Sequence, residues 1–183
     1  SCKKISYLFP RAHAVAYVMM AFRIAWFKVY HPLAFYAAYF SIRAKAFDLR
    51  IMTGDLNTQL KEFNRIKALD RGASPKEKDL MSALEVSMEM YQRGYRFINV
   101  DIQHSGARRF SIKDGALLPP FLAIDSLGET VADAIVEERD TKPFTSLKDL
   151  QRRCKVSTTI IETMKELKCC GDLPEDEQMS LFG

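Results

Sequence analysis

An aromatic and imidazole stripe near the start of the chain is the first group of side chains that could do chemistry. Phe9, His13 and Tyr17 are spaced at i, i+4 and i+8, which places them on one side of a helix. Pro10 suits the first turn of that helix, because its missing N–H leaves no hydrogen bond unmade there. Such a stripe either packs a core, the commoner role, or forms a stacking wall for a nucleotide base. Because the helix begins almost at the first residue, we expect the part that faces the stripe to belong to a larger assembly.

Charge is distributed unevenly along the 183 residues. The first 50 residues carry eight Lys or Arg and one Asp, whereas residues 51–183 carry 19 bases and 22 acids. A basic lobe followed by a mildly acidic one favours a phosphate-rich partner for the first lobe, although a solvated basic face would have the same composition. Hydrophobic residues make up 48% of the chain, which is enough to form a core in one or two domains.

Cysteine usage and hydropathy favour a reduced, cytoplasmic compartment. The four cysteines are Cys2, Cys154, Cys169 and Cys170. Two of them are adjacent and no CxxC or HxxxH pair occurs, so we expect neither a disulfide framework nor a metal site. No cleavable signal peptide is recognisable. The longest uncharged run in the apolar region 12–42 has fourteen residues and contains a proline, which is shorter than the roughly 18–20 residues of a membrane span.

The expected fold class is mainly α with a small β element. Apolar periodicity predicts four helices first, over residues 10–29, 32–44, 55–70 and 75–93. Asp55 is the expected N-cap of the third, and Ser74 with Glu77 has the spacing of a capping box for the fourth. Two β-like segments follow, at 96–102 and 107–112, with turns around Ser105-Gly106 and Lys113-Asp114-Gly115. Four short helical pieces come last, over residues 120–124, 129–139, 146–153 and 157–169.

A helix, a short turn and a second helix occur twice, over residues 120–139 and 146–169. The first copy resembles the helix-hairpin-helix DNA-binding motif, whose pattern is apolar-Gly-apolar-Gly-x-x-x-Ala. Leu127, Gly128 and Ala132 match that pattern, and Ser126 stands where the first glycine is usual. In the motif, glycine lets the turn approach a phosphate, and the free N–H groups at the following helix start point at it. Such contacts recognise the shape of the DNA backbone and not the base sequence.

The second copy turns at Lys155-Val156-Ser157 without a glycine, and Ser157 can cap the next helix or donate to phosphate. An ordinary αα-hairpin is the alternative for both copies. The candidate DNA-binding residues are Ser126, Leu127, Gly128, Glu129, Ser157 and Thr158.

The end of the chain carries a second candidate binding motif. Gln178-Met179-Ser180-Leu181-Phe182 resembles the bacterial sliding-clamp-binding motif, whose pattern is Gln-Leu-Ser/Asp-Leu-Phe. A short peptide that docks two apolar anchors in a groove of its partner would explain an apolar pair at this place. A stray apolar end is the alternative.

These motifs occur in one order: FPRAHAVAY, VDIQHSGARRF, the hairpin repeat and QMSLF. In that order they resemble the C-terminal part of the bacterial DNA polymerase III alpha subunit, the C-family replicative polymerase, in its PolC type from Gram-positive bacteria. The most specific block is Cys2 to Phe40. The resemblance implies that residues 1–95 belong to the fingers, that 96–171 form a duplex-binding region with tandem helix-hairpin-helix motifs, and that 172–183 are a flexible tail that tethers the enzyme to the sliding clamp.

The resemblance also implies roles for single residues and for partners. Tyr7, Phe9 and His13 match positions that line the pocket of the nascent base pair, and Lys4 and Arg11 match basic positions near the incoming dNTP. The implied partners are primer–template duplex DNA, dNTP, the sliding clamp and the palm-bearing remainder of the polymerase. The Mg²⁺ ions of the parent polymerase are held by palm carboxylates, which the family places upstream together with the exonuclease.

No clustered Asp-x-Asp occurs in this sequence, so we expect no catalytic residue, no metal ligand and no polymerisation by the chain alone. A free-standing, non-catalytic DNA-binding and clamp-associated module is the alternative function. A structural helical domain whose motifs have decayed is a third interpretation.

Overall fold

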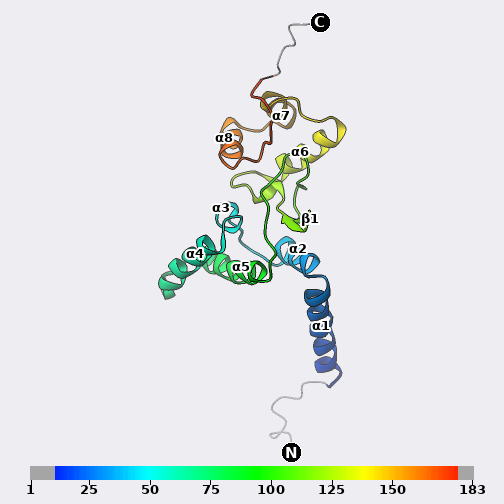
Figure 1. Cartoon of the computed structure of the whole chain (residues 1–183), viewed down its shortest axis with the longest axis vertical. Coiled ribbons are helices and arrows are strands. Elements are labelled where there is room, and N and C mark those ends of the chain that lie inside the picture. The colour runs from blue at the N-terminus through cyan, green and yellow to red at the C-terminus, as the bar shows by residue number, and fades with distance from the viewer. Residues whose placement is uncertain (1–10, 177–183) are drawn as a thin grey trace, which may run out of the picture.

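The computed structural model describes residues 11–176, with side chains from His13 onward. Two groups of helices follow one another along an elongated molecule (Figure 1). The first group is α1 (Arg11–Tyr30), α2 (Pro32–Ile42), α3 (Leu49–Met52), α4 (Leu56–Ala68), the 3₁₀ turn η2 (Asp70–Gly72) and α5 (Pro75–Gln92). The second group is β1 (Ser111–Lys113), β2 (Ala116–Leu118), the 3₁₀ helix η3 (Phe121–Ala123), α6 (Glu129–Thr141), α7 (Leu147–Cys154) and α8 (Thr158–Glu166). The expected mainly helical fold with a small β element is confirmed.

The two helix caps that the sequence predicts, at Asp55 and Ser74, are confirmed by their hydrogen bonds. The side chain of Asp55 accepts the N–H of Thr58 at 2.8 Å, which caps α4. Ser74 and Glu77 form the complete capping box of α5, since each side chain accepts a backbone N–H of the other residue. At the other end of α5, Gly94 has φ +85, a left-handed conformation that glycine adopts without steric cost.

The predicted strands at 96–102 and 107–112 are wrong in their bounds. The observed sheet is the antiparallel hairpin β1–β2, which the turn Asp114-Gly115 connects. Residues 96–98 reach it only through one isolated bridge, Phe97 to Leu117. The carbonyls of Gly106 and Ala107 accept the N–H groups of η3, so their hydrogen bonds go to a helix instead of a strand partner.

Two hydrophobic clusters hold the described part together, and Phe47 packs against both. One lies under α6, α7 and α8, and it includes Leu49 from α3. The other lies between α2, α4 and α5, and it includes Phe97 from the segment after α5 and Leu117 from β2. Each cluster therefore draws residues from both sides of the expected boundary at residue 95.

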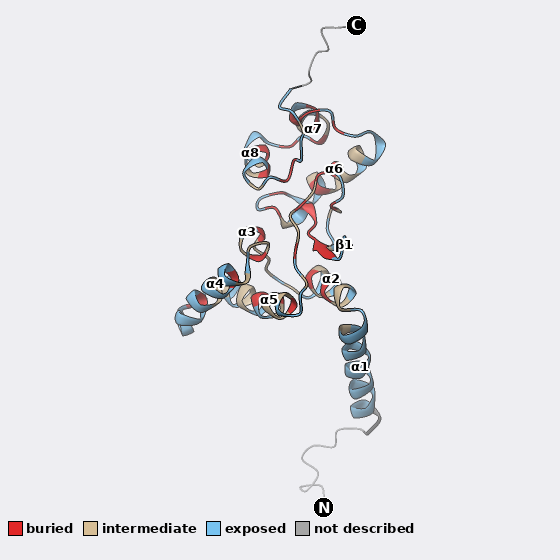
Figure 2. Cartoon of the chain, viewed as in Figure 1, coloured by how far each residue is buried: buried red, intermediate tan, exposed pale blue. Residues whose placement is uncertain are grey.

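Helix α1 projects from α2 and its side chains stay largely exposed (Figure 2). Phe22 is 72% exposed, Trp26 49% and Tyr30 65%. Lys28 joins the helix to α5 through an ion pair with Glu89 at 2.6 Å. A helix that is apolar on all sides is normally buried. Across residues 11–176, no helix is long and apolar enough to cross a membrane.

Candidate nucleic-acid interface

The first hairpin joins η3 to α6 through a tight turn. Ser126 has φ +65, the left-handed conformation that favours glycine. Leu127 follows with a side chain that is only 4% exposed, so it anchors the turn in the core. Gly128 is the N-cap of α6, with extended backbone at φ −75 and ψ 157. The turn thus places an exposed, extended residue at the helix start.

The second hairpin joins α7 to α8 through a turn of the same kind. Lys155 has φ +53, Val156 is 3% exposed, and Ser157 is the extended N-cap of α8 at φ −69 and ψ 153. The Ser157 hydroxyl accepts the N–H of Ile160 at 3.3 Å. Gln151 of α7 donates to the hydroxyl of Thr158 at 3.1 Å, which links the two helices across the turn.

The two turns are equivalent position by position, in backbone conformation and in burial. The matching pairs are Ser126 and Lys155, Leu127 and Val156, Gly128 and Ser157, Ala132 and Ile161, and Ile135 and Met164. The two turns therefore share one conformation although their sequences differ. A left-handed residue other than glycine costs roughly 1–2 kcal/mol, and burial of the apolar anchor in each turn offsets that cost.

The predicted DNA-binding residues gather at these two turns. Ser126, Gly128 and Glu129 are exposed at the first, and Ser157 and Thr158 are exposed at the second. Leu127 differs from the others, because its buried side chain serves the core and leaves no surface for DNA.

The starts of α6 and α8 offer backbone donors to a ligand. The first N–H groups of a helix have no partner within the helix, and a helix N-terminus favours an anion. Gly128 adds open space there, since a Cβ at this position would meet nothing within 4 Å. Its φ of −75 suits any residue, so openness is the property that glycine supplies at this site.

Arg153 fixes the two hairpins relative to each other. Its guanidinium lies 4.7 Å from the ring centre of Phe144 and donates to the Glu138 carboxylate at 2.9 Å. It also donates to the carbonyl of Lys142 at 3.0 Å and to Asp149 at 3.2 Å. The end of α6 is thereby held against α7.

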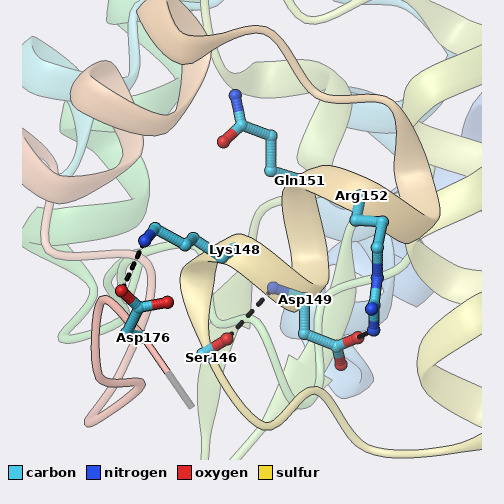
Figure 3. Close-up of a pocket in the computed structure, with 6 residues that line it drawn as sticks. All are labelled: Ser146, Lys148, Asp149, Gln151, Arg152 and Asp176. Carbon is cyan, nitrogen blue, oxygen red and sulfur yellow. Dashed lines mark hydrogen bonds and ion pairs between the residues drawn. The ribbon is translucent and has the colours of Figure 1, made fainter.

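A cavity of about 480 Å³ lies along the outer face of α7 (Figure 3). It is lined by Ser146, Lys148, Asp149, Gln151, Arg152 and Asp176. Its charged groups are paired with one another: Lys148 contacts Asp176, and Arg152 contacts Asp149 at 2.9 Å. Burial alone would raise the pKa of Asp149, yet bonds from Arg152, from the Thr145 N–H and from Arg153 hold that pKa below its ordinary value.

The structure covers only part of the predicted nucleotide site. His13 and Tyr17 lie on α1 as an edge-to-face pair, with ring centres 4.5 Å apart, which agrees with the expected i, i+4 spacing. Arg11 is the first residue of α1, and its side chain is not among those described. Lys4, Tyr7 and Phe9 lie outside the described residues, as does the whole clamp motif, Gln178 to Phe182.

The described residues hold no group of His, Cys, Asp and Glu side chains that could bind a metal ion. Burial raises the pKa of Cys154 to about 11, that of Cys169 to about 12 and that of Cys170 to about 11, so these thiols are poor nucleophiles.

Sequence reasoning missed one group beside the first hairpin. Arg108 forms ion pairs with Glu129 and Asp133 of α6, although it lies in a loop far upstream in the sequence. Arg108 belongs to the stretch VDIQHSGARRF, which contributes to the family resemblance, but nothing in that stretch predicts a contact with α6.

Comparison with known proteins agrees with this geometry. Residues 94–179, which contain both hairpins, match the family described as helix-hairpin-helix motif. The whole chain is 50% identical over 182 residues to the DNA polymerase III PolC-type of Caldanaerobacter subterraneus subsp. tengcongensis. The chain is a homologue of a segment of PolC-type DNA polymerase III. The PolC-type enzyme of Streptococcus pyogenes serotype M12 (strain MGAS2096) is 47% identical over 184 residues, and the chain spans 13% of the length of each relative.

Proposed function

We propose that this chain is the part of a PolC-type replicative polymerase that holds the primer–template duplex, lines the pocket of the incoming dNTP and tethers the enzyme to the sliding clamp. The observation that carries the proposal is the shared backbone path of the two hairpins within a chain homologous to a replicative polymerase. Two equivalent, exposed helix starts suit a ligand that presents phosphates at regular intervals, as duplex DNA does.

Duplex binding follows from the donors at the two turns. The first amides of α6 and α8 donate to phosphate oxygens, and the exposed hydroxyl of Thr158 adds a side-chain donor. Lys155 projects from the second turn with a positive charge. These contacts carry no information about base sequence, so the chain binds duplex of any sequence, as a replicative enzyme must.

The dNTP pocket is assigned to the start of the chain. His13 lies on α1, and Lys4, Tyr7, Phe9 and Arg11 precede it or begin the helix. The exposed apolar residues of α1 support a partner on this side, which in this proposal is the palm-bearing remainder of the polymerase. A free-standing module would leave this surface in water, so α1 favours the polymerase over that alternative.

The duplex assignment is tested with aspartate at the two N-caps. Aspartate is a good N-cap, so Gly128→Asp and Ser157→Asp keep the helices while placing a carboxylate where the phosphate binds. Fluorescence anisotropy with two unrelated duplexes over a salt series should give equal affinities that fall steeply with salt, and each variant should bind roughly tenfold more weakly. Ser74→Asp, at the exposed N-cap of α5, is the matched control with unchanged affinity. Binding that ignores salt, or equal binding by all variants, overturns the assignment.

The tether is tested separately with a purified bacterial sliding clamp. The chain should bind the clamp, and Phe182→Ala should lose that binding because it removes one of two apolar anchors. Duplex affinity of the same variant should stay unchanged. Equal clamp binding by both versions would remove the tail from the proposed function.

A further inference from the structure

Arg108 bridges two acids at the beginning of α6. Its Nε donates to the Asp133 carboxylate at 3.0 Å, and its two terminal nitrogens donate to Asp133 and Glu129. Glu129 is the first residue of α6, and Asp133 lies one turn further along the same face. The hydrogen bonds from Arg108 lower the pKa of Asp133, so this carboxylate is ionised at neutral pH.

The backbone around Arg108 is fixed to both halves of the molecule. The carbonyls of Gly106 and Ala107 accept the N–H groups of Phe121 and Leu122 in η3, at 2.9 and 3.0 Å. Two residues after Arg108, the chain is tied to α2 by a hydrogen bond from the Phe110 N–H to the Ser41 hydroxyl at 2.9 Å. The loop therefore holds the guanidinium of Arg108 at a fixed position beside the first hairpin.

A carboxylate at this place has two opposite effects. Negative charge in the first turn stabilises a helix. The same charge repels a phosphate that approaches the open amides of that turn. In the second hairpin the equivalent first residue is Thr158, which carries no charge, and Glu162 takes the place of Asp133 a turn further on. The helix start that bears an acid is thus the one that Arg108 covers.

We propose that Arg108 is a positioning residue for duplex binding, which neutralises Glu129 and Asp133 and keeps their carboxylates from repelling the phosphate at the first hairpin. The proposal rests on the proposed function, because it assumes that the α6 amides bind duplex phosphate. Arg108 acts through the two acids and makes no contact with the phosphate itself. Its planar fork suits this task, since it pairs with both carboxylates at once.

The test is a mutant cycle on the full 183-residue chain, read as duplex affinity by fluorescence anisotropy. Arg108→Ala should weaken binding roughly tenfold, because two uncompensated carboxylates then lie a few ångströms from the phosphate. In the Glu129→Gln/Asp133→Asn background the same substitution should change affinity less than about twofold. Arg109→Ala is the matched control for the loss of one exposed positive charge, and its effect should be equal in both backgrounds.

The outcomes separate this inference from the proposed function. If the unaltered chain fails to bind duplex, the proposed function fails. If it binds and Arg108→Ala costs the same factor in both backgrounds, or costs nothing in either, the role of Arg108 is refuted and duplex binding stands. Glu129→Gln/Asp133→Asn alone should bind duplex at least as tightly as the unaltered chain, since the two charges that Arg108 neutralises are then absent. Weaker binding by this variant also refutes the role, even if Arg108→Ala does not fold.

Discussion

Replacing Ser126 by glycine should stabilise the chain, although the Ser126 side chain is exposed. Ser126 holds φ +65, a conformation that costs an L-residue roughly 1–2 kcal/mol. Glycine adopts it freely but loses about 0.5–1 kcal/mol more conformational entropy on folding. The expected net gain is about 0.5–1 kcal/mol, which raises Tm by roughly 1–4 °C for a chain of this size. Lys155 at φ +53 is the equivalent residue, so Lys155→Gly should shift stability in the same direction.

Thermal unfolding followed by helical circular dichroism is the suitable assay. Trp26, the single tryptophan, lies on α1, so its fluorescence would not report on the hairpins. Ser126→Ala is the control, because alanine keeps a Cβ at positive φ and should leave Tm unchanged. If Ser126→Gly is no more stable than Ser126→Ala, the backbone reasoning is refuted. The duplex assay adds a second readout: Lys155→Gly should reduce the salt slope by about 0.9 if Lys155 meets a phosphate, and Ser126→Gly should not.

Three further predictions concern the second group of helices. The pKa of Asp149 is lowered in the folded chain, so the stability that its carboxylate contributes is complete above pH 3.8 and is lost as pH falls from there through the folded pKa. Asp149→Asn should therefore lower stability at neutral pH. In acid titrations followed by circular dichroism, the stability of this variant should converge with that of the unaltered chain. Cys154, Cys169 and Cys170 should react with iodoacetamide at pH 8 only after unfolding, as mass spectrometry of labelled peptides can establish. Ile135→Ala should cost roughly 2–5 kcal/mol in denaturant unfolding, because the fully buried side chain leaves a cavity; a loss below about 1 kcal/mol would contradict that packing.

Local signals explain which parts of the fold the sequence could predict. The N-caps Asp55 and Ser74 use side chains close in sequence to the amides they cap, so the helix starts at 56 and 75 follow from composition and spacing. The strand predicted at 96–102 is wrong because a β-like composition does not specify a partner strand. In the fold this segment makes a single bridge to Leu117, and the Ile102 N–H donates to the carbonyl of Cys169 after α8. α3 was not predicted, since four residues give too short a periodic pattern.

The candidate site also has a part that the sequence predicts and a part that only the structure shows. The turn at Ser126 and Gly128 could be recognised from a motif, whereas the equivalence of Lys155 with Ser126 appears only in the backbone angles, because no glycine marks the second turn. Arg108 and its two acids are separated along the chain, and only the fold brings them together. Side chains that act on a site from a distant loop leave no trace in local spacing.

The end of the described chain gives the proposed tether a physical starting point. The N–H groups of Leu147 and Lys148, at the start of α7, donate to the carbonyls of Pro174 and Glu175 at 2.9 and 3.2 Å. Lys165 of α8 contacts Glu175, so the segment before the clamp motif is fixed to the second hairpin on two sides. The turn at Lys155 lies at the opposite end of α7, roughly 12 Å away for a helix of eight residues.

If Phe182 docks on a clamp that surrounds the duplex, a short tail anchored here keeps the clamp next to the phosphates that the hairpins hold. Lengthening the tail after Asp176 by a flexible linker should then leave clamp affinity unchanged and lower the joint affinity for clamp-loaded DNA, because effective concentration falls with linker length; an unchanged joint affinity would show that the anchor at α7 does not matter for coupling.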